Sequence, residues 1–308
     1  MQLLTNFESV ISHLSAPGGK RSRVAVACPH DSHTLEAVED ALRCGLADVI
    51  LVGRSADKEL QRLVDEYRGR VEYVVEDDPD EAARRAVGLV REGCADVLMK
   101  GLLNTDNLLR AVLNKQNGIL EPGRVLSHVT GAQIASLGRL LFFSDPAVIP
   151  NPDLEQHSAI VGYLADVCRA FGIEQPRIAL IHCTEKTSEK FPVTLSYAEI
   201  KKRAAETVYG DAIVDGPMDV KTALDIPSGQ VKGIDSPIGG RADALVFPDI
   251  QAGNVFYKSI SFFADSLNAG MLMGAQAPVV LPSRSDSSRS KLCSLAMACL
   301  YAREQTKN

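Results

Sequence analysis

The sequence predicts an α/β protein whose mainly parallel sheets are flanked by helices, and three observations support this prediction. Short, almost wholly apolar runs recur along the chain, which is typical of strands buried on both faces of a sheet. Segments with helical periodicity separate these runs. The length of 308 residues suggests about two domains. The expected strands are 23–28, 48–52, 71–75, 95–99, 177–181, 212–215 and 242–247, with short strands at 271–273 and 279–281.

The helices are expected where apolar residues recur at spacings of three and four. Ser32 is a candidate cap for one of them. Residues 225–241 are rich in Gly, Pro and Ser and predict a long loop, and 145–152, with three prolines, predicts a crossover between two halves. The expected helices are 3–14, 32–43, 80–92, 153–171, 197–208, 254–267 and 287–303.

Composition argues against several classes of protein. The formal charge of −6, without a run of basic residues, gives no general attraction to nucleic acid. No apolar run approaches the roughly 18 residues that span a bilayer, and the N-terminus lacks the pattern of a signal peptide. The seven cysteines form no C-x-x-C pair, so we expect free thiols in a reducing cytoplasm rather than a zinc site or disulfides.

Common nucleotide-binding and hydrolase motifs are missing from the sequence. There is no G-x-x-x-x-G-K-[ST] loop, no G-x-G-x-x-G after the first strand and no G-x-S-x-G elbow. His30 and His33 follow the first strand, where ligands bind in open α/β sheets, but a surface loop is the favoured interpretation for both.

A first candidate anion site begins at Lys100, at the end of an expected strand, and runs into a helix. Thr105 or Asn104 can cap that helix, and its free N–H groups can bind an anion. Lys100 and Arg110 add positive charge. An ordinary capped helix with an exposed arginine is an equally good interpretation of the same residues.

A second candidate lies between the last expected strand and the last helix. Ser283, Arg284 and Asp286 stand among small and acidic capping residues, and Arg289 follows in the helix. Arginine beside a helix N-terminus is a common way to bind phosphate. The alternative is a plain Ser/Asp cap with incidental arginines.

Two further strand ends carry acidic residues. Asp215 and Asp219 flank an expected tight turn, for which a structural role is equally plausible. Asp249 and Asn254 frame another strand end, and Gly253 between them would allow a ligand to approach the backbone. An ordinary loop is the favoured interpretation of this last segment alone.

Taken in order, these segments resemble the phosphate acetyl/butyryltransferase family. The similarity runs from about residue 95 to 303, and the butyryl branch matches more closely through Asp-Ile-x-Ala-Gly-Asn and Ser-Arg-x-Asp-Ser. The segments that carry it are Lys100–Thr105, Leu126–His128, Asp145 with Pro150–Asp153, Asp215–Asp219, Pro248–Asn254 with Tyr257 and Lys258, and Ser283–Ser287.

The resemblance implies two α/β domains of isocitrate/isopropylmalate dehydrogenase-like architecture with an active-site cleft between them. One domain is expected to combine residues 1–144 and 270–308, and the other to span 145–269. The resemblance also implies a homo-oligomer, no required metal and no cofactor, because coenzyme A is a substrate.

The resemblance further implies roles for individual residues. Ser283 and Arg284 match the family's catalytic pair, and Arg110 matches an arginine of the phosphate site. Acetyl-transferring relatives place an Asp seven residues after the serine, where this chain has Ser290. Because that Asp is missing, the base that deprotonates the thiol of coenzyme A is unassigned. Asp286, nearby in the sequence, is a candidate for it. Further candidates for binding substrate or phosphate are Lys100, Thr105, Asp215, Asp249 and Asn254.

The expected activity is transfer of a short acyl group, butyryl above all, between coenzyme A and inorganic phosphate. The partners are then acyl-CoA, CoA, phosphate and acyl phosphate, without nucleic acid or membrane. Alternatives are an acetyl-specific transferase, a metal- and NAD-dependent decarboxylating dehydrogenase of similar architecture, and a non-catalytic sensor of phosphate or CoA. The sequence fixes neither the acyl chain nor the physiological direction.

Overall fold

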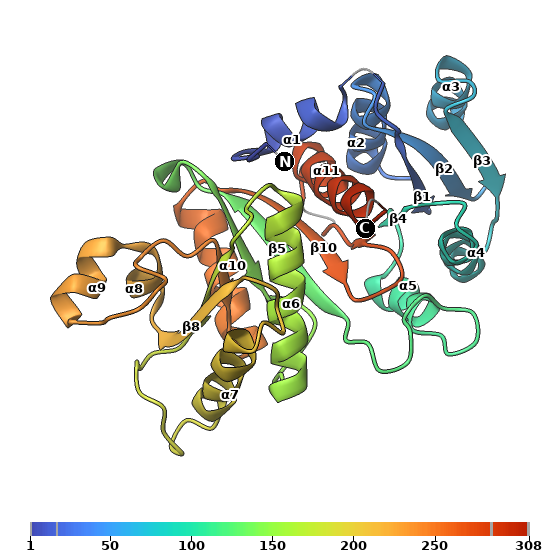
Figure 1. Ribbon diagram of the computed structural model, residues 1–308. Coiled ribbons are helices and arrows are strands. Elements are labelled where there is room, and N and C mark those ends of the chain that lie inside the picture. The colour runs from blue at the N-terminus through green and yellow to red at the C-terminus, as the bar shows by residue number, and fades with distance from the viewer. Residues whose placement is uncertain (1, 17, 284–285, 307–308) are drawn as a thin grey trace. The chain divides into compact units, whose positions relative to one another are not determined.

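A computed structural model describes residues 2–16, 18–283 and 286–306, and its chain forms two compact units (Figure 1). Unit 1 comprises Met1–Asn6 and Ser127–Leu267, and unit 2 comprises Phe7–Leu126 and Asn268–Asn308. Residues 127–144 therefore group with the following segment rather than with the preceding one, in contrast to the boundary expected at 144. The reason is that strand β6 (Leu140–Ser144) pairs with β9 (Ala244–Val246) in unit 1.

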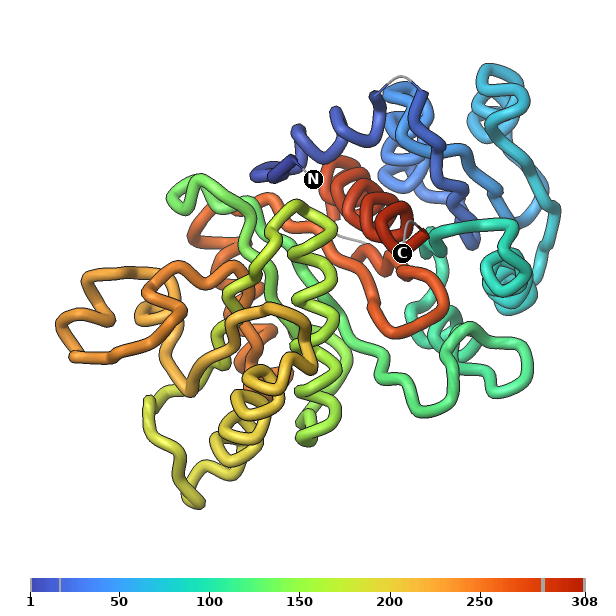
Figure 2. The backbone as a smooth tube through the Cα atoms, in the orientation of Figure 1, coloured from blue at the N-terminus to red at the C-terminus, as the bar shows by residue number. Residues whose placement is uncertain are grey.

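Unit 2 is built on a sheet with the strand order β3-β2-β1-β4-β11-β10. The first five strands run parallel and β10 is antiparallel to β11. Figure 2 shows the C-terminal segment, in red, returning beside the blue N-terminal helices, and α11 contacts α1 and α2. The strands are β1 (Ser22–Ala27), β2 (Ala47–Gly53), β3 (Val71–Val75), β4 (Val97–Lys100), β10 (Leu267–Met273) and β11 (Val279–Val280), and the helices are α1 (Phe7–Leu14), α2 (Ser32–Arg43), α3 (Lys58–Glu66), α4 (Pro79–Arg91), α5 (Thr105–Val112) and α11 (Ser288–Gln305).

The strand order of unit 2 contains a switch point. The chain steps from β1 to β2 to β3 in one direction and then places β4 on the other side of β1. With right-handed crossovers, this reversal puts the helices that connect β1, β2 and β3 on one face of the sheet and the helix that leads from β3 to β4 on the other. The carboxyl ends of β1 and β4 therefore border the crevice where open α/β sheets bind their ligands.

Unit 1 has the strand order β5-β6-β9-β7-β8, in which β5 and β6 are antiparallel and the other pairs are parallel. The mainly parallel α/β class is therefore confirmed in both units. The strands and helices not yet given are β5 (Ser127–Gln133), β7 (Arg177–Ile181), β8 (Ile213–Met218), the short 3₁₀ helix η1 (Ala135–Leu137), α6 (Leu154–Ala170), α7 (Val193–Ala205), α8 (Val220–Leu224), α9 (Ile226–Lys232) and α10 (Ile250–Phe263).

Several expected elements differ from those in the structure. The segment 225–241 is not a continuous loop, because Asp225 caps α9 by accepting a hydrogen bond from the Ser228 N–H at 3.0 Å. The helix expected at 254–267 starts four residues earlier, at Ile250, and its expected end belongs to β10. The helix expected at 3–14 starts only at Phe7. The cap of α2 is Asp31 rather than Ser32.

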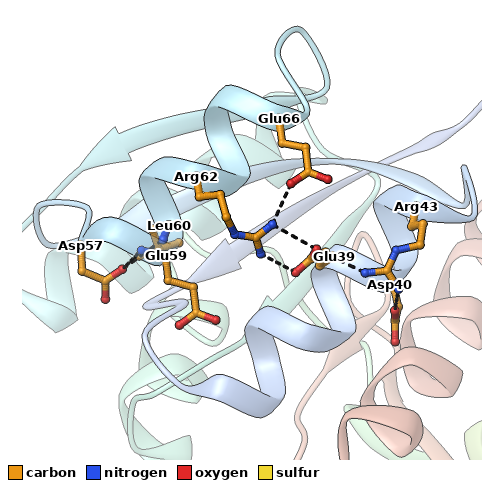
Figure 3. Close-up of polar contacts among 8 residues, drawn as sticks. All are labelled: Glu39, Asp40, Arg43, Asp57, Glu59, Leu60, Arg62 and Glu66. Carbon is orange, nitrogen blue, oxygen red and sulfur yellow. Dashed lines mark hydrogen bonds and ion pairs between the residues drawn. The ribbon is translucent and has the colours of Figure 1, made fainter.

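The outer helices of unit 2 are joined by an exposed charge network. Arg62 on α3 contacts Glu39 on α2 and Glu66 on its own helix, and Arg43 contacts Glu39 as well (Figure 3). Such exposed pairs contribute little stability individually. In the part of the chain that the structure describes, the helices are too short or too polar to span a bilayer.

Candidate active site

The switch point of unit 2 is closely packed. The N–H of Gly101 donates to the Ala27 carbonyl at 2.8 Å, and the N–H of Leu102 donates to the Cys28 carbonyl at 2.7 Å. A Cβ at position 101 would lie 2.3 Å from the Cys28 oxygen, so only glycine fits there. The loops after β1 and β4 are therefore held against each other at the edge where a ligand is expected.

Lys100 ends β4 at this switch point and is only 4% exposed. Its ammonium donates to the carbonyl oxygens of Gly101 and Leu103 at 3.2 and 3.3 Å. Both acceptors are backbone groups of the turn that leads into α5. A buried cation held over the start of a helix is suited to an anionic ligand, and the role of Lys100 in binding substrate stays a prediction.

Helix α5 separates the residues that the sequence analysis had grouped. Asn104 occupies the N-cap position without a side-chain cap bond, and Thr105 is the exposed first residue. Arg110 lies in the last turn, about 7–8 Å further along the axis at 1.5 Å per residue. It therefore stands further from the N-terminus of α5 than expected, and there it lines a cavity of about 230 Å³ with Arg84 and Asp80. Its role in binding phosphate stays a prediction.

The segment after β11 forms a turn closed by Asp286. The N–H of Ser283 donates to Asp286 Oδ2 at 2.8 Å, and the N–H of Asp286 donates back to the Ser283 carbonyl at 3.1 Å. Ser283 is exposed. The Asp286 carboxylate thus holds the turn that presents Ser283, and its assignment as base stays a prediction. Arg284 lies outside the described residues.

Lys100 and the Ser283 turn leave neighbouring strands at the same edge. Strand β11 pairs in parallel with β4, and Val280 is opposite Met99. Lys100 therefore aligns with residue 281, two positions before Ser283. The structure brings these two candidates, which are far apart in the sequence, to adjacent strand ends of unit 2.

Two residues near this turn have contacts that the sequence analysis did not predict. Lys291, 3% exposed on the first turn of α11, donates to Asp31 Oδ1 and Thr34 Oγ1, both at 3.0 Å. His33, which had been expected in a surface loop, is exposed and its Nδ1 lies 3.1 Å from the Asp286 carbonyl. The only local signal in the sequence was the Asp at the start of α2, a preferred cap.

In unit 1, Asp215 lies inside β8 rather than beside a tight turn, which corrects the expectation. It is 8% exposed, its Oδ1 lies 2.5 Å from the Lys201 ammonium, and its Oδ2 accepts from the Ser236 hydroxyl at 2.5 Å. Both carboxylate oxygens thus have partners inside the unit. This arrangement supports a structural role at least as well as the predicted role in binding substrate.

Asp219 caps α8 by accepting from the Thr222 N–H at 2.9 Å, and it pairs with Lys232. Burial acts to raise the pKa of Asp219, but the hydrogen bonds from Lys232 and Thr222 outweigh it and lower the pKa to about 2. Lys232 also contacts Glu185 at 2.5 Å. Asp219 is therefore a charged, paired cap in the folded protein.

The turn after β9 is fixed by backbone contacts. Asp249 caps α10 by accepting from the Ala252 N–H at 2.8 Å, and Asn254 donates to the Pro146 carbonyl at 3.0 Å. A Cβ at Gly253 would lie 2.5 Å from the backbone carbonyl oxygen of Asp145. Gly253 thus lets α10 approach the backbone of Asp145, rather than letting a ligand approach. The roles of Asp249 and Asn254 in binding substrate stay predictions.

Asp145 anchors the segment that α10 approaches. It is 2% exposed, and its carboxylate accepts four hydrogen bonds at 2.8–3.1 Å. The donors are Ser127 Oγ and the backbone N–H groups of His128, Ala147 and Val148. Among the described residues, no group of three or more His, Cys, Asp and Glu is placed to hold a metal ion.

Comparisons with known proteins identify relatives that match most of the chain. A phosphate butyryltransferase of Clostridium acetobutylicum is 38% identical over 305 residues, which cover 97% of this chain and 99% of that protein. A phosphate acetyltransferase of Thermotoga maritima is 33% identical over 286 residues, covering 92% and 96%. The structure of a branched-chain phosphotransacylase from Enterococcus faecalis V583 matches with a TM-score of 0.81 and 29% identity, covering 91% and 99%.

A family model also matches. The model of the phosphate acetyl/butaryl transferases covers residues 71–299, which include both strand ends of the unit 2 site and the acidic positions of unit 1. The resemblance seen in the sequence is thereby confirmed, and this chain belongs to the phosphate acetyl/butaryl transferase family.

Proposed function

We propose that this protein transfers a short acyl group between coenzyme A and inorganic phosphate, with butyryl as the main substrate. Relatives named for this reaction match nearly the whole chain. The observation that carries the proposal is the pairing of β4 with β11, which brings Lys100 and the Ser283 turn to one edge. A buried cation and an exposed hydroxyl at adjacent strand ends suit an anionic acyl acceptor.

The proposed chemistry is direct transfer within a ternary complex. The thiolate of CoA attacks the carbonyl carbon of acyl phosphate, the thioester bond forms, and the C–O bond to phosphate breaks. A thiol with a pKa near ~8.5 needs a base or nearby positive charge to raise its thiolate fraction at neutral pH. Ser283 hydrogen-bonds the thiol or the developing oxyanion, and Arg284 and Arg110 hold phosphate.

The decisive experiment measures release of free thiol from butyryl-CoA by the purified protein, with and without phosphate. We expect release only when phosphate is present. Equal release without phosphate would identify a hydrolase and overturn the proposal. EDTA should leave the rate unchanged, whereas NAD- and metal-dependent turnover would favour the dehydrogenase alternative.

The choice of acyl chain is a matter of degree. One buried methylene contributes roughly ~0.8 kcal/mol, so neighbouring chain lengths are separated by only a few-fold in rate. The relatives include butyryl, acetyl and branched-chain enzymes. Comparing kcat/KM for acetyl-, propionyl-, butyryl- and isobutyryl-CoA tests the preference, and an acetyl optimum would favour the acetyl-specific alternative.

We further propose that the protein acts as a homo-oligomer in the cytoplasm and has the architecture of isocitrate/isopropylmalate dehydrogenases. Helix α10 supports the first point, because Val255, Phe262 and Phe263 are 65%, 82% and 83% exposed. Exposed apolar side chains of this size favour a protein contact. Sedimentation would reveal an oligomer, and Phe262→Ser with Phe263→Ser should shift it towards monomer.

A further inference from the structure

The buried Lys291 and the partly buried Asp31 form an ion pair that the proposed chemistry does not use. Lys291 stands on the first turn of α11, where its N–H bonds the Ser287 carbonyl at 3.1 Å. Its ammonium, almost wholly buried, reaches Asp31, the N-cap of α2, and Thr34 on the first turn of that helix. The two charges are 260 positions apart in the sequence.

Asp31 serves two partners at once. It caps α2 through the Thr34 N–H at 2.9 Å while it accepts the hydrogen bond from Lys291. Burial acts to raise the pKa of Asp31, but hydrogen bonds from Thr34 and Lys291 outweigh it and lower the pKa. The carboxylate is therefore charged at neutral pH and can hold the ammonium in one place.

A second contact joins the same two segments. His33 Nδ1 lies 3.1 Å from the carbonyl oxygen of Asp286. A carbonyl oxygen can only accept, so Nδ1 carries the proton in this contact. Asp286 in turn holds Ser283 through two hydrogen bonds. The start of α2 thus contacts the chain on both sides of Ser287. It contacts Lys291 of α11 after Ser287 and Asp286 of the Ser283 turn before it.

We propose that Asp31, His33 and Lys291 are positioning residues that hold Ser283 in its reactive place, and this inference rests on the proposed transferase function. An ion pair with a buried partner is weak evidence for stability, because desolvation offsets much of the attraction. It does restrict geometry, and a displacement of about 1 Å in a catalytic group can cost about 10²-fold in rate. The three residues act through the turn and need not touch substrate.

His33→Ala gives the cleanest test, because His33 is exposed and its loss should not affect folding. We expect kcat to fall by about 5–10-fold while the thermal midpoint and the KM for phosphate stay near wild type. Glu36→Ala, an exposed change on the same helix, is the matched control and should leave kcat unchanged. Equal kcat values for His33→Ala and wild type would contradict the role of His33.

The ion pair is tested by a double-mutant cycle on kcat, measured per folded molecule. Lys291→Met and Asp31→Asn should each lower kcat by about 10-fold or more. The kcat of the double variant should be no lower than that of the less active single variant. Asn at position 31 can still cap α2, so a loss of the cap does not explain such a result. Additive losses, or rates near wild type in both single variants, would overturn the proposal.

A structural readout separates this inference from the proposed function. In Lys291→Met, backbone amides of residues 281–290 should exchange with deuterium faster than in wild type, while amides in β1 and β2 keep their protection. Unchanged exchange at 281–290 would refute the positioning role even in an active enzyme. A wild-type protein without phosphate-dependent thiol release, but with the expected change in exchange, would overturn only the transferase assignment.

Discussion

The strand ends of the two units use their charged residues differently. In unit 1, Asp215 and Asp219 have lysine partners, and Asp249 caps a helix. In unit 2, Lys100 is held by backbone carbonyls and Ser283 is exposed on a turn that Asp286 closes. Acids that already have partners are poorly suited to bind a metal ion. The difference supports the proposed site at the strand ends of unit 2 and counts against the dehydrogenase alternative.

Loss of the Arg284 side chain should slow the reaction more than any other change considered, and its role rests on the resemblance to the family. Arg284→Ala should lower kcat by about 10²–10³-fold, by analogy with removing one preorganised charge-stabilising donor. Arg284→Lys should recover only part of this loss, because lysine cannot make a bidentate contact with phosphate.

Arg289 provides the matched control for that experiment. Its guanidinium pairs with Glu8 of α1 on an exposed surface, so it already has a structural partner. Arg289→Ala should keep near-normal kinetics. If it proved more damaging than Arg284→Ala, the phosphate would have been assigned to the wrong arginine.

Asp215 in unit 1 should affect stability rather than catalysis. Asp215→Ala leaves Lys201 and Ser236 without their shared acceptor, so we expect a loss of about 1–3 kcal/mol in the free energy of unfolding. Urea titrations measure this loss, and kcat of the folded protein should stay close to wild type. A tenfold rise in KM with unchanged stability would instead support the predicted role in substrate binding.

A smaller effect depends on pH. The pKa of Asp219 is lowered from 3.8 to about 2 in the folded protein. Its contribution to stability is therefore complete above about pH 4 and is lost as the pH falls towards 2. Asp219→Asn, which can still cap α8, should be less stable than wild type at pH 7, and this gap should narrow below pH 4. A gap that is independent of pH would contradict the pairing with Lys232.

The smallest effect is expected away from the strand ends. Arg62→Ala removes the two bridges that Arg62 makes in the exposed network on α2 and α3, yet such pairs contribute little. The thermal midpoint should move by no more than about 1–2 °C, and kcat should not change. A large loss of activity would show that the outer helices of unit 2 affect the site.

The buried parallel strands could be predicted because each is a short apolar run between helical segments. Residues 71–75 and 177–181 were predicted at their exact bounds. Other elements had no such signal. Strand β8 continues through Gly216 and Pro217, which is tolerated because β8 is an edge strand. Helix α10 starts before Gly253. A glycine is needed inside this helix because the backbone of Asp145 approaches it closely.

The site was predictable only in part. Local patterns pointed to Lys100 and Ser283, because a strand end followed by a capped helix is visible in the sequence. Nothing local indicated that Lys291 would meet Asp31, since that contact depends on the order of the strands. The place of Arg110 could be read only in part, because five residues separate it from the start of α5 and carry it into the last turn of that short helix.

The split organisation of unit 2 has a consequence for synthesis on the ribosome. Strand β4 lies between β1 and β11, and α11 packs on α1 and α2, so this unit cannot be completed until residues 268–305 have been made. Residues 127–267 of unit 1 emerge earlier and can pair among themselves. Until β11 arrives, one edge of β4 is unpaired and open to wrong partners. The nascent chain is therefore most vulnerable to aggregation between the translation of β4 and that of β11.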